Sequence, residues 1–141
     1  MDRWLAHRAY KNHKKDFSRV FVVCTEQNRV VAYYALSSYA IERKALPNLE
    51  DSPDPIPAVL LGRLAVDSAF QKNGLGSSLV QDALLRILSA KQNIGIKAII
   101  VHALNDKAAK FYKTLGFEDL GRARLELFIT VADLEETFAN L

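Results

Sequence analysis

The residues best suited to chemistry lie in two stretches between positions 63 and 117. The first, residues 63–76, joins an apolar segment to a glycine-containing turn, which a long amphipathic stretch follows. Gly74 and Gly76 allow backbone N–H groups to turn inward, and a helix that begins at Leu75 adds the positive end of its dipole. This order of strand, turn and helix predicts an anion site suited to a pyrophosphate.

The glycines alone leave the nature of this turn open. A dinucleotide-binding fingerprint would have a third glycine near Leu79, and a Walker loop would contain Gly-Lys-Ser/Thr, but the sequence has neither. Taken by itself, the turn is more typical of an ordinary connection between a strand and a helix.

The second stretch predicts a short helix over residues 106–115. Asn105 is expected as its N-cap and Gly116 as its C-terminal stop. The helix carries Tyr112, which we expect to be exposed. The two stretches together provide what acyl transfer from coenzyme A requires.

Together, the two motifs resemble the GNAT family of acetyl-CoA-dependent N-acetyltransferases. The motifs are Gln-x-x-Gly-x-Gly at 71–76 and Asn-x-x-Ala-x-x-Phe-Tyr-x-x-x-Gly-Phe at 105–117. The resemblance implies a single α/β (α+β) domain over 1–141, with a mixed, twisted sheet, splayed central strands and flanking helices. It also implies that acetyl-CoA lies between those strands. The cofactor-binding residues implied in this way are Leu64, Ala65, Val66, Gln71, Lys72, Asn73, Gly74, Leu75, Gly76, Ser77 and Asn105.

Three further segments, 18–22, 32–37 and 57–67, are similar to the TacT-type subfamily of GNAT toxins. This resemblance implies a cytoplasmic toxin that acetylates the α-amino group of aminoacyl-tRNA and blocks translation. It also implies a ribbon-helix-helix antitoxin and a homodimer. Members of the subfamily usually have a further stretch before the position of Trp4. We therefore expect the N-terminal strand of the family to be missing, so that the sheet leans on a partner.

The resemblance and reference pKa values together suggest a mechanism. Tyr112, with a reference pKa of about 10, can protonate a thiolate of about 8.5 while remaining un-ionised at neutral pH. The backbone N–H of Val66 or its neighbour is the expected oxyanion donor. Asp67, Asp106 and His102 are weak candidates for a general base, and we expect His102 to be a structural residue of a strand. A site poor in bases suits an α-amine, with a pKa near 8, better than a lysine amine near 10.4.

The charge of the chain is unevenly distributed. Residues 1–20 contain six basic and two acidic residues, whereas the whole chain has a net charge of +3. A solvated helix face would explain this segment, but an RNA substrate makes a phosphate-binding patch the better interpretation. The residues expected to contact tRNA are Arg8, Lys11, Lys14, Lys15, Arg19 and Arg63. Arg43 and Lys44 are further candidates, and Arg63 could instead pair with a carboxylate inside the sheet.

Composition excludes several other classes of protein. No apolar run approaches the roughly 18 residues of a membrane span, and a lone Cys24 allows neither an intrachain disulfide nor a thiolate zinc cluster. We expect Cys24 to be an inert strand residue and no metal to be bound. Two other functions remain open: a GNAT acetyltransferase for a small amine or a protein N-terminus, and a non-catalytic domain that binds coenzyme A or a partner.

The elements that must position these residues follow from hydrophobic periodicity. We expect a helix near residues 4–10, then a hairpin, then an exposed proline-containing loop over 44–57. A helix over 75–91 follows, with Leu75, Leu79, Ala83, Ile87 and Ala90 on its apolar stripe. The hairpin strands are expected at 20–24 and 30–37. The remaining expected elements are strands at 58–66 (with a bulge at Gly62), 98–103 and 125–129, and a weakly amphipathic helix at 131–141.

Overall fold

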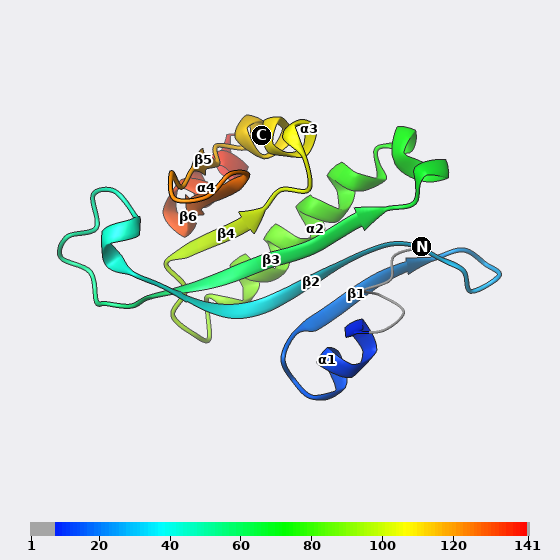
Figure 1. Ribbon diagram of the computed structural model, residues 1–141, viewed down its shortest axis with the longest axis horizontal. Coiled ribbons are helices and arrows are strands. Elements are labelled where there is room, and N and C mark those ends of the chain that lie inside the picture. Colours follow the sequence, from blue (N-terminus) through cyan, green and yellow to red (C-terminus); the bar gives the residue numbers. More distant parts are fainter. Residues whose placement is uncertain (1–7, 141) are drawn as a thin grey trace. The chain divides into compact units, whose positions relative to one another are not determined.

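The computed structural model describes residues 8–140, apart from the side chains of residues 72 and 73. In this part of the chain, six strands form a sheet in the order β1-β2-β3-β4-β6-β5 (Figure 1). The elements are α1 (Tyr10–Lys14), β1 (Arg19–Cys24), β2 (Val30–Ile41), β3 (Ile56–Val66), α2 (Leu75–Ala90), β4 (Ala98–His102), α3 (Asp106–Thr114), β5 (Glu118–Asp119), β6 (Glu126–Thr130) and α4 (Val131–Ala139).

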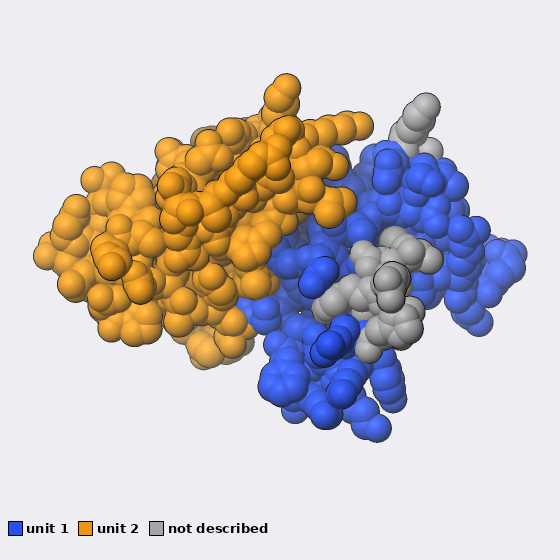
Figure 2. Space-filling model, in the orientation of Figure 1, with its two compact units in different colours: residues 1–37, 61–86 blue, residues 38–60, 87–141 orange. Residues whose placement is uncertain are grey.

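The chain divides into two compact units, which Figure 2 shows in different colours. Unit 1 comprises residues 1–37 and 61–86, and unit 2 comprises residues 38–60 and 87–141. The first motif, residues 71–76, therefore belongs to unit 1, and the second, residues 105–117, belongs to unit 2.

In unit 1, β1 and β2 form the predicted hairpin. They pair antiparallel, from Arg19 opposite Leu36 to Cys24 opposite Val30. Asn28 in the connecting turn takes a left-handed conformation (φ 64°), which asparagine tolerates better than most residues. The second strand continues to Ile41, beyond its predicted end.

A polar cluster joins α2 to this hairpin. The Tyr34 hydroxyl donates to Asp82 Oδ2, which also accepts from Arg86 Nε at 3.0 Å. The Arg86 guanidinium lies 4.2 Å from the centroid of the Phe21 ring, and that ring stacks on Tyr34 with centroids 5.0 Å apart. Burial, followed by the contact with Asp82, raises the pKa of Tyr34 well above its usual range. The cluster fixes the start of the sheet against the helix that follows the candidate anion site.

The predicted helix α2 buries most of its expected stripe. Its buried residues are Leu79, Val80, Ala83, Leu84 and Ile87. Ala90 was wrongly placed on the stripe: it is exposed, because it is the last residue of the helix and the chain turns there.

In unit 2, β4 and β6 pair antiparallel, from Ala98 opposite Thr130 to His102 opposite Glu126. One hydrophobic cluster of this unit packs on the even-numbered side of these strands and of β3. Its buried members are Ile41, Leu46, Ile56, Ala58, Ala98, Ile100, Leu120 and Phe128. Strand β5 was not predicted, because two acidic residues show no apolar alternation. Helix α4 confirms the predicted helical tail, with Thr130 Oγ1 accepting from the Asp133 N–H at 3.2 Å.

Other boundaries differ from the predictions. The helix expected near residues 4–10 falls mainly outside the described residues, and the described helix α1 ends only at Lys14. Strand β3 begins at Ile56, because the proline-containing loop is shorter than expected. The expected irregularity at Gly62 appears at its neighbour, where Arg63 takes a positive φ of 59°.

Candidate functional site

The end of β3 and the turn after it form a closely hydrogen-bonded structure. The Asp67 side chain caps a 3₁₀ helix (η3, Ser68–Asn73) by accepting from the Ala69 N–H at 3.0 Å. Gln71 Nε2 donates to the Val66 carbonyl at 2.9 Å. In this structure the Gln71 side chain therefore holds the last peptide of β3, a role that its assignment to the pyrophosphate did not include.

A backbone contact of Asp67 limits which N–H group can serve as the oxyanion donor. The Asp67 N–H donates to the Val31 carbonyl at 2.7 Å. Because this N–H is occupied, the neighbour of Val66 on the C-terminal side is not available to an oxyanion. The Val66 N–H stays the candidate.

Gly74 and Gly76 differ in backbone conformation and in the space around them. Gly74 has φ 72°, in the left-handed region that glycine adopts without strain. Gly76 has an ordinary φ, and a Cβ added there would lie 3.8 Å from Val66 Cγ2, an ordinary contact. The chain itself therefore does not require glycine at position 76, and the space beside it is free for a ligand to approach.

Helix α2 begins directly after the turn. The Ser78 N–H donates to the Gly74 carbonyl at 3.1 Å. The N–H groups of residues 75–77 precede this bond and have no carbonyl one turn back within the helix. Together with the helix dipole, such N–H groups bind anions. The geometry of unit 1 thus fits a pyrophosphate at residues 71–77, although the side chains of Lys72 and Asn73 lie outside the described residues.

The second motif folds as predicted at both ends of α3. Asn105 Oδ1 accepts from the Ala108 N–H at 2.9 Å, which confirms the N-cap. Gly116 ends the segment with φ 100°, and a Cβ there would lie 3.3 Å from Ile129 Cδ1. Because the Asn105 oxygen is used for capping, a ligand would meet the amide N–H groups of this side chain.

The prediction that Tyr112 is exposed was wrong. Its side chain is only 5% exposed, and its ring makes an edge contact with Phe117 at 5.4 Å between centroids. The i, i+3 spacing along α3 turns Ala109 and Tyr112 toward the core of unit 2. Burial raises the pKa of Tyr112 to about 12, so the hydroxyl stays protonated at neutral pH.

Each of the three candidate bases is bound to another group. The Ala69 N–H, and after it the Arg29 guanidinium at 2.9 Å, lower the pKa of Asp67. Asp106 forms an ion pair with Arg124 at 3.0 Å. A carboxylate with a lowered pKa is a weaker proton acceptor, which disfavours Asp67 as a general base.

His102 belongs to a polar network that sequence reasoning missed. Its Nε2 lies 2.9 Å from Oε2 of Glu126, whose residue is only 6% exposed. Arg122 contacts both Glu126 oxygens, at 2.7 and 3.1 Å, and also donates to the Tyr39 hydroxyl at 3.2 Å. Arg122, aided by His102 and opposed by burial, lowers the pKa of Glu126. The signal was present in the sequence: Glu126 is the one charged residue in the apolar run 125–129.

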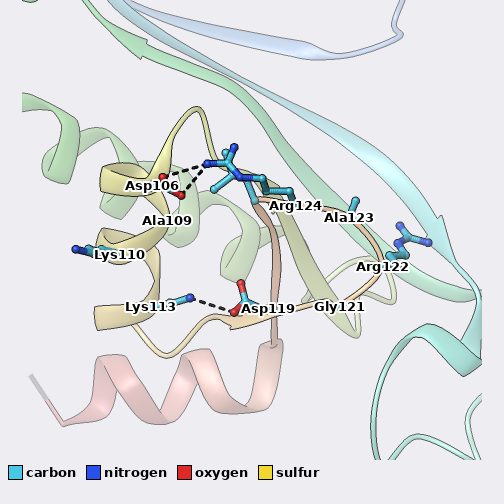
Figure 3. Close-up of a pocket in the computed structure, with 10 residues that line it drawn as sticks. Asp106, Ala109, Lys110, Lys113, Asp119, Gly121, Arg122, Ala123 and Arg124 are labelled. Atoms are coloured by element: carbon cyan, nitrogen blue, oxygen red, sulfur yellow. Dashed lines mark hydrogen bonds and ion pairs between the residues drawn. The ribbon is translucent and has the colours of Figure 1, made fainter.

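A cavity of about 600 Å³ opens between α3 and residues 119–125 of unit 2 (Figure 3). Two ion pairs cross it, Arg124 with Asp106 and Lys113 with Asp119, at 3.0 Å in each case. None of the predicted cofactor-binding residues is among those that line it. This cavity is therefore distinct from the predicted cofactor site.

The basic residues near the N-terminus are exposed, as a contact surface requires. This holds for Arg8, Lys11, Lys14, Lys15 and Arg19. Arg63 lies on β3 in the same unit and is also exposed. Arg43 Nη1 donates to the Ser52 carbonyl at 3.0 Å, and Lys44 Nζ lies 3.5 Å from Glu42 Oε2. Both contacts lie within the loop that follows β2 in unit 2.

Two kinds of feature are absent from the described part of the chain, residues 8–140. Within residues 8–140, no group of three or more His, Cys, Asp or Glu side chains is placed to hold a metal ion. None of the described helices combines the length and apolar character that crossing a lipid bilayer requires.

The chain is similar to characterised proteins over nearly its whole length. The tRNA-acetylating toxin of Mycobacterium tuberculosis (strain ATCC 25618 / H37Rv) is 42% identical over 135 residues, which are 94% of this chain and 81% of that protein. The structure of AtaT complexed with acetyl-methionyl-tRNAfMet matches with a TM-score of 0.86 and 35% identity, covering 96% of this chain and 84% of that one.

A second solved structure is a tyrosine-to-phenylalanine mutant of the AtaT toxin, bound to the C-terminus of the antitoxin AtaR and to acetyl-CoA. It matches with a TM-score of 0.80 and 33% identity, covering 96% of this chain and 81% of that one. The model of the acetyltransferase (GNAT) domain matches residues 17–119. The family expected from the two motifs is confirmed: the chain belongs to the GNAT family of acetyltransferases.

Proposed function

We propose that this acetyltransferase is a toxin that uses acetyl-CoA to acetylate the α-amino group of aminoacyl-tRNA, and so blocks translation. The observation that carries the substrate is the 42% identity, over 94% of the chain, to a tRNA-acetylating toxin. The likeness to AtaT, solved with acetyl-methionyl-tRNAfMet, supports the same substrate class.

Acetyl-CoA would supply the activated acetyl group as a thioester. The backbone of Leu64, Ala65 and Val66 would contact its pantetheine arm, and residues 71–77 would hold its pyrophosphate. Support comes from the left-handed turn at Gly74, the free space beside Gly76 and the N–H groups at the start of α2. Asn105 would add a contact to the pantetheine arm through its amide N–H groups.

Two groups of the chain would act on the reacting atoms. The Val66 N–H would donate to the carbonyl oxygen as negative charge develops there. Tyr112 would donate to the departing sulfur. The raised pKa of about 12 keeps the Tyr112 hydroxyl protonated, which a hydrogen-bond donor requires. The contacts with Phe111 and Phe117 fix the plane of its ring.

The chain would not need a strong base for an α-amine. The α-amine reference pKa of about 8 leaves a fraction of it neutral at pH 7, whereas a lysine amine near 10.4 is almost wholly protonated. Asp67 and Asp106 are engaged in ion pairs, and His102 contacts Glu126. A site of this kind favours an aminoacyl ester over a protein lysine.

The exposed cations Arg8, Lys11, Lys14, Lys15 and Arg19 would contact RNA phosphates, and Arg63 would add to them from β3. We further propose a cytoplasmic homodimer controlled by an antitoxin of the ribbon-helix-helix type. The AtaT structure with the C-terminus of AtaR supports a protein antitoxin.

Cell-free translation with purified protein tests this function. With acetyl-CoA, translation should stop, and without acetyl-CoA it should continue. The protein with the substitution Gly76→Gln, which fills the space beside the turn, is the matched control and should leave translation running. Release of coenzyme A in the presence of small amines or peptides, with translation unaffected, would instead favour the alternative acetyltransferase.

A further inference from the structure

The surface formed by α1 and the turn into β1 combines exposed aromatic rings with positive charge. Tyr10 is 75% exposed and Phe17 is 68% exposed, both well above what an aromatic side chain of a folded core shows. Residues 8–19 contain five basic side chains and a single carboxylate, Asp16. We call this set, Tyr10 and Phe17 with Arg8, Lys11, Lys14, Lys15 and Arg19, the aromatic–basic surface.

The backbone contacts of this surface hold it in a defined conformation. The Phe17 N–H donates to the Asn12 carbonyl at 2.9 Å, so the turn that carries the ring is tied to α1. The Val20 N–H donates to His13 Nδ1 at 3.1 Å, which ties α1 to β1. Figure 1 shows α1 beside β1, both in unit 1. The two rings are therefore displayed on a fixed scaffold.

The charges of the surface favour a polyanion. The single carboxylate, Asp16, is paired with Arg19 at 2.7 Å, and Arg19 also donates to the His13 carbonyl at 3.0 Å. Lys14 Nζ lies 6.0 Å from the centroid of the Tyr10 ring, so a cation stands beside an aromatic face. An acidic partner that meets this surface would find four further cations without a competing carboxylate in the segment.

Exposed rings among cations are the combination that recognises single-stranded nucleic acid. Unpaired bases stack on aromatic side chains, and the backbone phosphates between them contact lysine and arginine. A double helix hides its bases from such rings and would use the cations alone. The aromatic–basic surface therefore fits RNA with unpaired nucleotides better than it fits a duplex.

We propose that Tyr10 and Phe17 stack on unpaired nucleotides at the 3′ end of the tRNA substrate, while the surrounding cations contact its phosphates. This inference rests on the proposed function, since it assumes an RNA substrate. It adds a binding role for two aromatic residues, and it requires that the enzyme distinguish RNA with an unpaired 3′ end from RNA without one.

The test compares two probes: deacylated tRNA with its 3′ end intact, and the same tRNA with the unpaired 3′ nucleotides removed. The double variant Tyr10→Ala, Phe17→Ala should bind the intact tRNA about 10- to 100-fold more weakly. It should bind the trimmed tRNA as the unsubstituted protein does, with an unchanged salt slope. Tyr10→Phe should keep full affinity, because the stacking ring is retained.

Two control variants separate stacking from charge and from general exposure. The double variant Lys11→Gln, Lys14→Gln should weaken binding of both probes equally and lower the salt slope by roughly 1 to 2. Ile94→Ala removes a side chain that is 65% exposed in unit 2 and should change neither affinity. Circular dichroism of every variant should give the unfolding temperature of the unsubstituted protein, since the replaced side chains are exposed.

Each of three binding results would overturn the inference. The aromatic double variant could bind intact tRNA normally, it could lose affinity for both probes alike, or it could lose only the binding of an acidic antitoxin peptide. Acetyl transfer to charged tRNA by the unsubstituted protein is measured in parallel. Its absence would refute the proposed function, whereas its presence with normal activity of the aromatic variant would refute only the stacking role.

Discussion

Replacing Tyr112 by phenylalanine removes the hydroxyl that we assign to the departing sulfur and leaves the ring in place. The contacts of the ring with Phe111 and Phe117, at 5.9 and 5.4 Å between centroids, do not involve the oxygen. The free energy of unfolding should therefore change by less than about 1 kcal/mol. Tyr112→Ala would be a poor test, because deleting a buried ring costs about 3–5 kcal/mol.

The size of the effect on catalysis follows from the pKa of the buried phenol. At about 12, it lies about 3.5 units above a thiol at 8.5, so complete proton transfer to a free thiolate is uphill by about 5 kcal/mol. We therefore expect Tyr112 to stabilise the developing thiolate mainly by a charge-assisted hydrogen bond. Such a bond contributes about 1.5–3 kcal/mol, which corresponds to about a 10- to 150-fold decrease in kcat for Tyr112→Phe.

The assay is steady-state release of coenzyme A with saturating charged tRNA, and KM should change little. Tyr39→Phe is the matched control, because it removes a hydroxyl that accepts from Arg122 and should leave kcat unchanged. The unsubstituted enzyme should show no decline in kcat from phenol ionisation below about pH 10. A kcat for Tyr112→Phe within threefold of the unsubstituted value would remove the hydroxyl from the mechanism.

Three other outcomes are expected. Gly76→Ala should keep or slightly raise the unfolding temperature, yet it should weaken acetyl-CoA binding measured by calorimetry. Gly74→Ala should instead destabilise the fold by about 1 kcal/mol, because Gly74 has a positive φ. Equal effects of the two substitutions on the stability of the fold would contradict this distinction. Glu126→Leu should lower the free energy of unfolding in urea by about 1 kcal/mol at pH 7, because it removes the carboxylate that holds Arg122, whose side chain is 40% exposed and stays partly solvated. The lowered pKa of Glu126 means that this stabilisation is complete above about pH 4.3 and is lost as the pH falls through the folded value, so a pH-independent difference would count against it. Ser18→Ala should stabilise the protein by up to about 1 kcal/mol, because Ser18 Oγ is, among the described residues, the buried side-chain atom without a hydrogen-bond partner. A clear loss of stability would show that this hydroxyl does have a hydrogen-bond partner.

The elements of the fold could be predicted because their signals are local. Asn105 and Gly116 mark the two ends of α3 through capping and a positive φ, and both were confirmed. The hairpin of β1 and β2 follows from alternation alone. The predicted apolar stripe was wrong where the tertiary structure decides burial. Ala90 fits the helical period, but it is exposed because it lies at the end of α2.

The site was harder to predict, because burial and pairing come from residues distant in sequence. The identity of Tyr112 in its motif gave no information on its burial, which Phe117 and the core of unit 2 produce. The network of His102 and Glu126 depends on the register of β4 and β6, 24 residues apart. Likewise, nothing in the spacing of Gln71 shows that its amide binds the Val66 carbonyl.

The most direct test of the proposed function is to identify the acetylated atom. Charged tRNA is incubated with the protein and acetyl-CoA and digested with ribonuclease, and the 3′-terminal aminoacyl-adenosine is analysed by mass spectrometry. We predict a single added acetyl group on the α-amine of the amino acid, with none on the nucleoside. Unmodified aminoacyl-adenosine from a protein preparation that still acetylates a small amine or a peptide would contradict the assignment of aminoacyl-tRNA as the substrate.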